Sequence, residues 1–140
     1  MEFPFTAAVV GALLIILQQI LMMITGTHRG RVMIGVGFGD DKELERKIRR
    51  HGNLAENAAI FIVVLSLTEG FLGTNFAIIA FGTVFTIARI CHAAAFSSLA
   101  GSHGQEGASK IFVRLRLVGA LGNGLSGIGL GLYLLSVLFL

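Results

Sequence analysis

The stretch that decides the fold is Phe3 to Thr25, which reads FPFTAAVVGALLIILQQILMMIT and contains no charged residue. A run of about 20 apolar residues is long enough for an α-helix to cross the hydrocarbon core of a bilayer. A cleavable signal peptide would begin with a positive charge and carry a shorter apolar region. We therefore predict a membrane-spanning helix that the protein retains, with Pro4 in its first turn and its exit at Gly26.

The composition of the whole chain agrees with a membrane protein. Of the 140 residues, 54% are hydrophobic and 14% are charged, whereas soluble domains carry about 25% charged residues. A soluble domain of this length has too small a core to bury so much apolar surface. The single cysteine, Cys91, excludes an internal disulfide framework and a cysteine-ligated zinc site, because both need several thiols.

Three more helices follow the first one. We expect the helices at about residues 3–26, 41–70, 75–98 and 111–139, with Asp40 or Asp41 as the N-cap of the second and the glycine-rich segment 35–39 as a turn. Backbone amides in lipid must be satisfied within the chain, and no alternating pattern indicates a barrel. The predicted fold class is therefore an all-α integral membrane protein, with residues 1–140 forming one domain built on a four-transmembrane-helix bundle.

The distribution of basic residues predicts the orientation of this bundle. Apart from Arg89, every Lys and Arg lies in residues 29–50 or 110–116, and the connection between the second and third helices has none. By the positive-inside rule, loops 27–50 and 97–115 are cytoplasmic and both termini lie on the opposite side. The basic excess is thus a topological signal, and we expect no nucleic acid partner.

One face of the second helix carries the most informative polar residues. Arg49, Asn53 and Glu56 fall at i, i+4 and i+7, so that a cation, an amide and an anion share one side of the helix. Ionisable side chains near membrane depth are costly and are therefore functional candidates, with structural ion pairs as the usual alternative. The spacing alone is equally consistent with a binding face and with a network that braces the bundle.

The third helix contributes Arg89 and His92. We expect an ion pair between Arg89 and Glu56, because an arginine at this depth needs a partner. A lone histidine in a bundle is more often a packing residue than a ligand or a base. No metal site is expected, since the four histidines show no ligand spacing. Gln18 and Gln19 of the first helix are predicted to hydrogen-bond between helices.

The fourth helix combines arginines with glycines. Arg114 and Arg116 lie at its start, where ordinary snorkelling is the simplest interpretation. Gly127 and Gly131 have the small-xxx-small spacing that permits close approach of two helices. We predict a packing surface here, within one subunit or between subunits.

Three segments carry a resemblance to a known family. They are GVGFGD at 35–40, IRRHGNLAE at 48–56 and ARICHA at 88–93. With four apolar spans, they make the chain resemble the membrane-associated proteins in eicosanoid and glutathione metabolism (MAPEG), which include microsomal glutathione transferases and microsomal prostaglandin E synthase. The bacterial members are the most similar, which implies a bacterial inner membrane.

This resemblance implies an assembly and roles for particular residues. It implies a homotrimer that binds glutathione between neighbouring subunits near the cytoplasmic side. The glutathione contacts implied are Arg49, Asn53, Glu56 and His92, together with Arg29 or Arg31 at the end of the first helix. Arg116, in Leu115-Arg116-Leu117, matches the family arginine that is proposed to stabilise the glutathione thiolate. A nearby guanidinium lowers a thiol pKa and so raises the thiolate fraction.

Three positions depart from the family pattern. Active members often have tyrosine where this chain has Asn57 and Phe96, so that two hydroxyl groups are missing. Arg50 stands where relatives often have alanine, and the sequence assigns it no role.

The resemblance predicts a membrane-bound, glutathione-dependent transferase or peroxidase. Its acceptors would be lipophilic electrophiles or lipid hydroperoxides that arrive through the membrane lipid. A binding or regulatory protein that retains the fold without turnover is the alternative, and the missing tyrosines favour it. A small transporter would need broken helices or a polar stripe through the midplane, of which this sequence has little.

Overall fold

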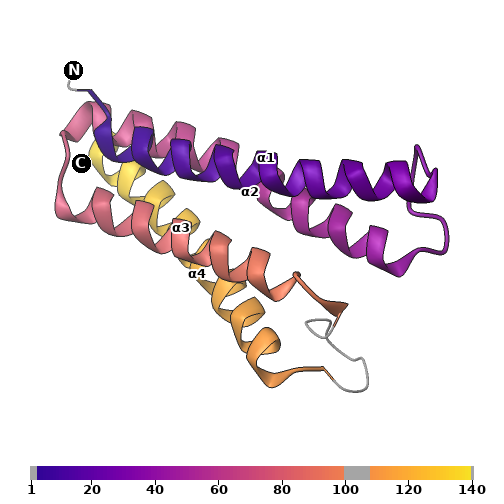
Figure 1. The fold of residues 1–140 in the computed structure, drawn as a ribbon. Coiled ribbons are helices and arrows are strands. Elements are labelled where there is room, and N and C mark those ends of the chain that lie inside the picture. The colour runs from indigo at the N-terminus through magenta and orange to yellow at the C-terminus, as the bar shows by residue number, and fades with distance from the viewer. Residues whose placement is uncertain (1–2, 100–107, 140) are drawn as a thin grey trace.

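The computed structural model describes residues 3–99 and 108–139, which form four α-helices. They are α1 (Phe5–Val32), α2 (Lys42–Leu72), α3 (Phe76–Ala95) and α4 (Lys110–Phe139). Figure 1 shows that the helices run alternately in opposite directions, with both chain ends at one end of the bundle. Each helix is long and apolar enough to cross a membrane. The predicted fold class, an all-α integral membrane protein with a four-helix bundle, is confirmed.

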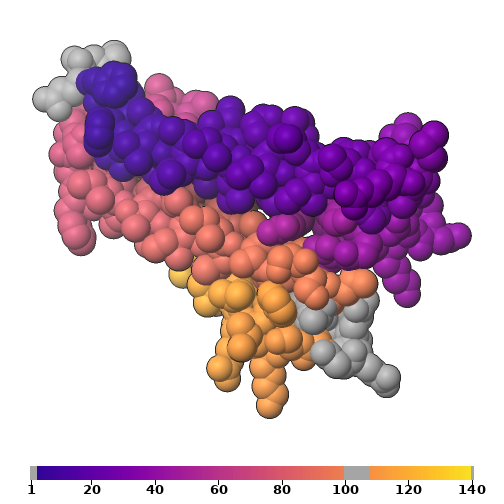
Figure 2. All heavy atoms as spheres, viewed as in Figure 1, coloured from indigo at the N-terminus to yellow at the C-terminus, as the bar shows by residue number. Residues whose placement is uncertain are grey.

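The bundle is made of two hairpins. α1 packs mainly on α2, and α3 packs mainly on α4. Figures 1 and 2 show the α1–α2 hairpin lying across the α3–α4 hairpin, with the two diverging toward the C-terminal ends of α1 and α3. The candidate functional residues lie at this diverging end.

Side chains cap the N-termini of two helices. Asp41 is the N-cap of α2, and its Oδ1 accepts the backbone N–H of Leu44 at 2.9 Å. Asn75 caps α3 by accepting the N–H groups of Ala77 and Ile78. Each cap satisfies donors that have no partner inside the helix. The predicted cap of the second helix is confirmed, with Asp41 rather than Asp40 in that role.

The end of α1 differs from the prediction, which placed it at Gly26. The helix continues to Val32 and ends because Met33 adopts a left-handed conformation, with φ of 57°. The prediction placed the end where the apolar run stops. Hydropathy marks the boundary of the lipid, however, and helical hydrogen bonds continue beyond it. Gly37 and Gly39, both at positive φ, then turn the chain toward α2, as predicted for this segment.

Aromatic and aliphatic side chains form the core between the hairpins. Leu14, Leu65 and Ile78 are at most 2% exposed. The rings of Phe61 and Phe85 stack with centroids 3.7 Å apart and an interplanar angle of 3°. Outside this core, large apolar side chains cover the outer surfaces of all four helices. Such a surface is favourable only against lipid or another subunit.

Within one chain, the glycines of α4 that pack against α3 are not the predicted pair, Gly127 and Gly131. A Cβ at Gly119 would lie 2.9 Å from the Ala88 carbonyl oxygen, and one at Gly122 would lie 2.9 Å from the Ala88 Cβ. Gly127 and Gly131 have no atom within 4 Å of the same position and line a cavity instead. A Cβ at Gly129 would lie 2.7 Å from Phe81 Cε1 of α3, so the close contact within the chain uses Gly119, Gly122 and Gly129. Small-xxx-small spacing alone does not say which face of a helix meets its neighbour.

A buried carboxylate closes the end of the bundle where the chain begins. Glu69, 0% exposed, accepts the backbone N–H groups of Thr6 at 2.9 Å and Ala7 at 2.8 Å, and the hydroxyl of Thr74 at 2.7 Å. The carboxylate thereby caps α1 from the end of α2 and lies near the positive pole of the α1 dipole.

Candidate functional site

A recess lies along the exposed face of α2 at the diverging end of the bundle. Its volume is about 290 Å³, and its lining includes Arg49, Asn53 and Glu56, with Phe38, Glu45, Ile48 and Gly52. The predicted sharing of one helical face by the first three residues is therefore observed. Arg49 and Glu56 are exposed, and their side chains make no hydrogen bond or ion pair with another residue in the described parts of the chain. This face presents two charges that have no partner among the described residues.

The recess is open on one side. All seven lining residues come from α2 and the segment before it. Ligand sites usually enclose about 300–1,000 Å³ and bury most of the ligand surface. A molecule in this recess would therefore need a second wall from outside the hairpin.

Arg116 lies in a separate cluster between α3 and α4. Its guanidinium carbon is 4.8 Å from the centre of the Phe96 ring, within the range of a cation–π interaction. Phe96 in turn stacks on His92, with ring centroids 4.9 Å apart. Gly119 allows α4 to approach α3 directly beside His92. The structure thus brings His92, Phe96 and Arg116 together, but none of them lines the α2 recess.

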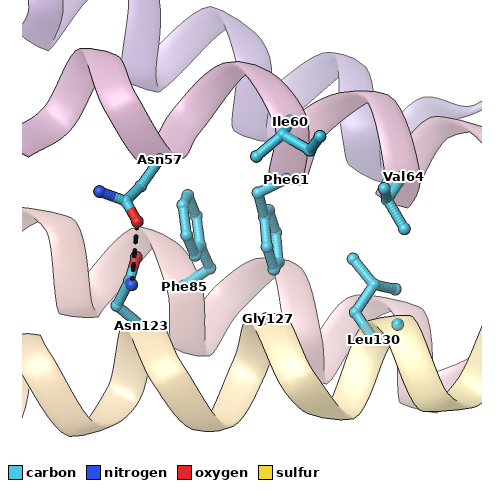
Figure 3. A pocket seen from close by; sticks show the side chains of 9 residues that line it. Asn57, Ile60, Phe61, Val64, Phe85, Asn123, Gly127 and Leu130 are labelled. Atoms are coloured by element: carbon cyan, nitrogen blue, oxygen red, sulfur yellow. Dashed lines mark hydrogen bonds between the residues drawn. The ribbon is translucent and has the colours of Figure 1, made fainter.

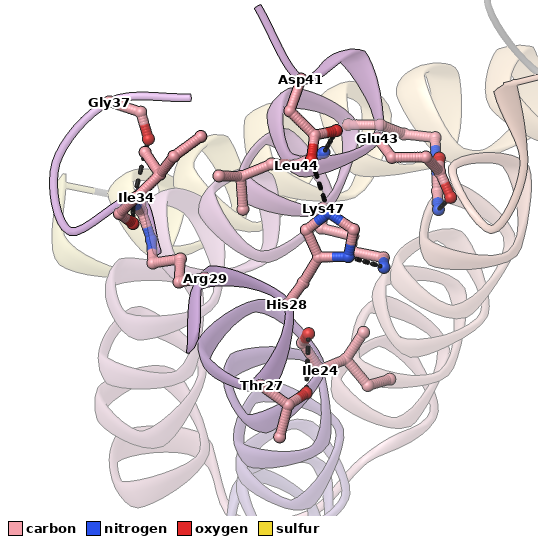
Figure 4. A network of polar contacts seen from close by, with 11 residues as sticks. Ile24, Thr27, His28, Arg29, Ile34, Gly37, Asp41, Glu43, Leu44 and Lys47 are labelled. Atoms are coloured by element: carbon pink, nitrogen blue, oxygen red, sulfur yellow. Dashed lines mark hydrogen bonds and ion pairs between the residues drawn. The ribbon is translucent and has the colours of Figure 1, made fainter. Parts of the chain in front are cut away.

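The two arginines at the end of α1 have different surroundings. Arg29 donates from Nη1 to the carbonyl oxygens of Ile34 at 3.2 Å, Gly35 at 3.3 Å and Gly37 at 2.8 Å. Figure 4 shows the Arg29 side chain extended toward Ile34 and Gly37. Arg31 is exposed and has no such contact among the described residues. Of the two predicted carboxylate-binding candidates, Arg31 is the one left available.

A polar chain fixes the α1–α2 connection beside these arginines. His28 Nε2 lies 2.8 Å from Asp41 Oδ2, and Lys47 Nζ lies 2.8 Å from His28 Nδ1 (Figure 4). Because an ammonium group can only donate, His28 Nδ1 accepts from Lys47, and Nε2–H donates a hydrogen bond to the Asp41 carboxylate. The His28 hydrogen bond, with that of the Leu44 N–H, holds the pKa of Asp41 below its usual value.

The predicted ion pair between Arg89 and Glu56 is wrong for this chain. Arg89, 3% exposed, donates from Nη1 to Asn123 Oδ1 on α4 at 2.8 Å. Glu56 is exposed on another face. Two residues on neighbouring helices pair only when both faces are turned toward each other, and spacing within each helix does not determine that rotation.

Asn123 extends this contact to α2. Its Nδ2 donates to Asn57 Oδ1 at 3.3 Å, as Figure 3 shows, and both amides line a cavity of about 160 Å³. The stacked rings of Phe61 and Phe85 form part of the same cavity. Asn57 is therefore occupied in joining helices.

Gln18 and His51 form a further contact between helices. The amide nitrogen of Gln18 lies 2.7 Å from His51 Nε2, and because that nitrogen can only donate, the imidazole accepts. This confirms the predicted role of Gln18 between helices, whereas Gln19 is exposed.

Sequence reasoning missed two arginines at the start of α2. Arg46 pairs with Glu43 at 2.6 and 2.9 Å and also donates from Nη1 to the backbone oxygen of Phe96. Arg50 donates from Nε to the backbone oxygen of Ala93 at 2.6 Å. Their spacing of four residues was a signal, since it places both guanidinium groups on one side of the helix. Its target, the end of α3, could not be read from the sequence.

Within residues 3–99 and 108–139, no three His, Cys, Asp or Glu side chains lie close enough together to bind a metal ion. His103, one of the four histidines considered from the sequence, lies outside these ranges.

Comparison with known proteins identifies the family. A search of curated proteins gave no significant match. The sequence model of the MAPEG family, by contrast, matches residues 7–135, which include all four helices nearly in full. The match covers the α2 recess, the Arg116 cluster and the polar contacts between helices. The chain belongs to the MAPEG family.

Proposed function

We propose that the protein is a glutathione-dependent transferase or peroxidase that works as a homotrimer, with glutathione held between neighbouring subunits. The MAPEG family includes enzymes of both kinds. The observation that carries the proposal is the open recess, in which the cation Arg49 and the anion Glu56 have no partner within residues 3–99 and 108–139. Two exposed charges of opposite sign in one recess can bind a ligand that carries both an acidic and a basic group.

The charged and amide groups of glutathione are complementary to those that line this recess. Glutathione carries two carboxylates, one ammonium group and two amides. Arg49 would pair with a carboxylate, Glu56 with the ammonium group and Asn53 with an amide. Arg31 is available for the second carboxylate, and His92 lies beside Arg116.

The division of the candidate residues supports a site shared between subunits. Arg49, Asn53 and Glu56 lie in the recess, whereas Arg116 and His92 lie on another surface of the same chain. A neighbouring subunit that covered the recess with its α4 would join the two sets. The exposed apolar faces of α1 and α4 provide the area that such an assembly needs.

Arg116 would act by stabilising the glutathione thiolate. In conjugation, the sulfur bonds to an electrophilic carbon and the leaving group departs with its electron pair. In peroxide reduction, the sulfur attacks the terminal oxygen and the O–O bond breaks to release an alcohol. A second glutathione then yields the disulfide and water. We place loops 27–50 and 97–115 in the cytoplasm, in a bacterial inner membrane, because their positive charge favours that side.

The test is the ultraviolet absorbance of the thiolate when the purified trimer is titrated with glutathione in detergent. We expect a saturable signal that Arg116→Ala removes and Arg116→Lys partly retains. Arg114→Ala is the matched control, because Arg114 is an exposed arginine two residues away on the same helix. Equal signals in Arg116→Ala and Arg114→Ala would refute the role of Arg116. No binding at millimolar glutathione would refute the proposal as a whole.

A non-catalytic glutathione-binding protein is the second candidate. Phe96 has no hydroxyl to offer the thiol, and the Asn57 amide is engaged by Asn123. Turnover of a broad set of electrophiles and lipid hydroperoxides distinguishes the two candidates. Binding with thiolate formation but without turnover would favour this second one.

A further inference from the structure

We propose that Arg46 and Arg50 of α2, acting through Phe96, are positioning residues that set the orientation of Arg116. This inference rests on the proposed function, because it concerns the arginine assigned to the thiolate. It gives a role to Arg50, which the sequence left without one.

The first step is the clamp on the end of α3. Arg50 Nε donates to the Ala93 oxygen at 2.6 Å, and Arg46 Nη1 donates to the Phe96 oxygen. Carbonyl groups in the last turn of a helix lack partners within the helix and carry its negative pole. Two guanidinium groups on these carbonyls therefore cap α3 and place positive charge at the negative pole of its dipole, which is favourable.

The second step is the anchoring of Arg46 itself. The Glu43 carboxylate accepts from Arg46 Nε at 2.6 Å and from Nη2 at 2.9 Å, which leaves Nη1 for Phe96. A bidentate carboxylate fixes the plane of a guanidinium group. The Arg46 side chain is 7% exposed and that of Glu43 is 44% exposed, so the guanidinium group is buried while its carboxylate partner is open to water. The bidentate contact fixes the α2 side of the clamp in one geometry.

The third step connects the clamp to Arg116. Phe96 is the C-cap residue of α3, and its backbone is the group that Arg46 holds. Its ring is supported by His92 at a centroid distance of 4.9 Å and lies 4.8 Å from the Arg116 guanidinium carbon. The Phe96 ring is therefore a platform: α2 holds its backbone through Arg46, and its face contacts the Arg116 guanidinium group.

The platform has a consequence for the thiol. Arg116 is only partly buried, and a free arginine side chain samples many rotamers. A cation–π contact favours those in which the guanidinium lies over the ring. Electrostatic stabilisation of a thiolate depends on such preorganisation. Loosening the clamp should therefore lower the thiolate fraction without removing any group that touches glutathione.

The experiment measures Arg116 directly and then its effect on the thiol. In the full-length trimer with labelled arginine, ring currents from Phe96 should shift the Arg116 side-chain NMR signals upfield, with Arg116→Lys used for assignment. We expect Phe96→Leu to abolish this shift and Arg50→Met to reduce it by about half or more. Arg50→Lys should restore part of it, because an ammonium group can still donate to Ala93. Lys42→Met, which removes an exposed charge from the same helix, should leave it unchanged.

The second readout is the pH profile of thiolate absorbance. Arg50→Met should lower the thiolate fraction at neutral pH about threefold, or about half a pKa unit, while the Kd for glutathione changes less than about twofold. Unchanged Arg116 signals and an unchanged profile in Arg50→Met, with only a lower Tm, would overturn the positioning role. If the wild-type protein forms no thiolate, the proposed function fails, and the NMR comparison still decides whether α2 positions Arg116.

Discussion

The two ends of the bundle satisfy their charged groups in opposite ways. At the end where the chain begins, one carboxylate, that of Glu69, is fully buried and accepts three hydrogen bonds from its own chain. At the diverging end, Arg49 and Glu56 remain exposed without partners in the described residues, beside an open recess. At the first end the charge is satisfied within the chain, whereas at the second end the proposed function assigns Arg49 and Glu56 to glutathione. We therefore expect changes at the first end to affect mainly stability and changes at the second end to affect mainly the proposed binding, and the following variants test this separation.

Glu69→Ala should have the largest effect on stability. It leaves the N–H groups of Thr6 and Ala7 buried without an acceptor, and each such loss costs about 1–3 kcal/mol. We expect a total loss of about 3–5 kcal/mol in the free energy of unfolding, measured by denaturing-detergent titration in mixed micelles. Glu45→Ala, which removes a partly exposed carboxylate from the same helix, is the control for charge. Equal losses of unfolding free energy in the two variants would mean that the hydrogen bonds of Glu69 do not stabilise this end of the bundle.

Asn123→Leu should be the next most damaging change. Arg89 would then keep its charge in the bundle interior without its observed partner, Asn123 Oδ1. We expect a loss of about 2–4 kcal/mol. Asn123→Asp provides the contrast, since a carboxylate could pair with the guanidinium and should preserve more stability than leucine. If the free energy of unfolding of Asn123→Leu equals that of the wild type, Arg89 has a partner elsewhere, such as a group on a neighbouring subunit.

The sequence predicted the elements of this fold better than their contacts. Uninterrupted apolar runs fix the spans, because a helix in lipid must satisfy its own backbone, and Asp41 as N-cap follows from local chemistry. The partner of Arg89 could not be predicted, because it depends on how α3 and α4 are rotated about their axes. The same limit explains why Gly119 and Gly122, and not Gly127 and Gly131, meet α3.

The candidate site shows the same division between local and long-range information. The shared face of Arg49, Asn53 and Glu56 was predictable, because it lies within one helix with a known period. The clamp of Arg50 on Ala93 joins residues 43 positions apart, and no pattern within either helix indicates it. Helical periodicity thus locates polar faces, while contacts between helices need the three-dimensional structure.

The His28–Asp41 contact should produce a small, pH-dependent effect at the diverging end. The pKa of Asp41 is lower in the folded state than in the unfolded state. The contact therefore stabilises the fold at pH values above the unfolded-state pKa. This contribution is lost as the pH falls through the lowered folded pKa. We expect the Tm of the wild type to fall more steeply than that of Asp41→Asn between about pH 5 and about pH 2. Asp40→Asn, at the exposed neighbouring position, should retain the wild-type slope; matching slopes in all three proteins would dismiss the contact.

Arg49→Met should have the smallest effect on stability and so sharpens the contrast most. The Arg49 side chain is exposed and makes no hydrogen bond or ion pair within the described residues, so the cost should stay within about 0.5 kcal/mol. Glutathione binding, however, should weaken at least about tenfold, because one charge-assisted contact to a carboxylate is lost. Lys42→Met on the same helix should change neither quantity. A large loss of stability with intact binding would reverse the assignment, since the exposed charges of α2 would then brace the assembly and not receive a ligand.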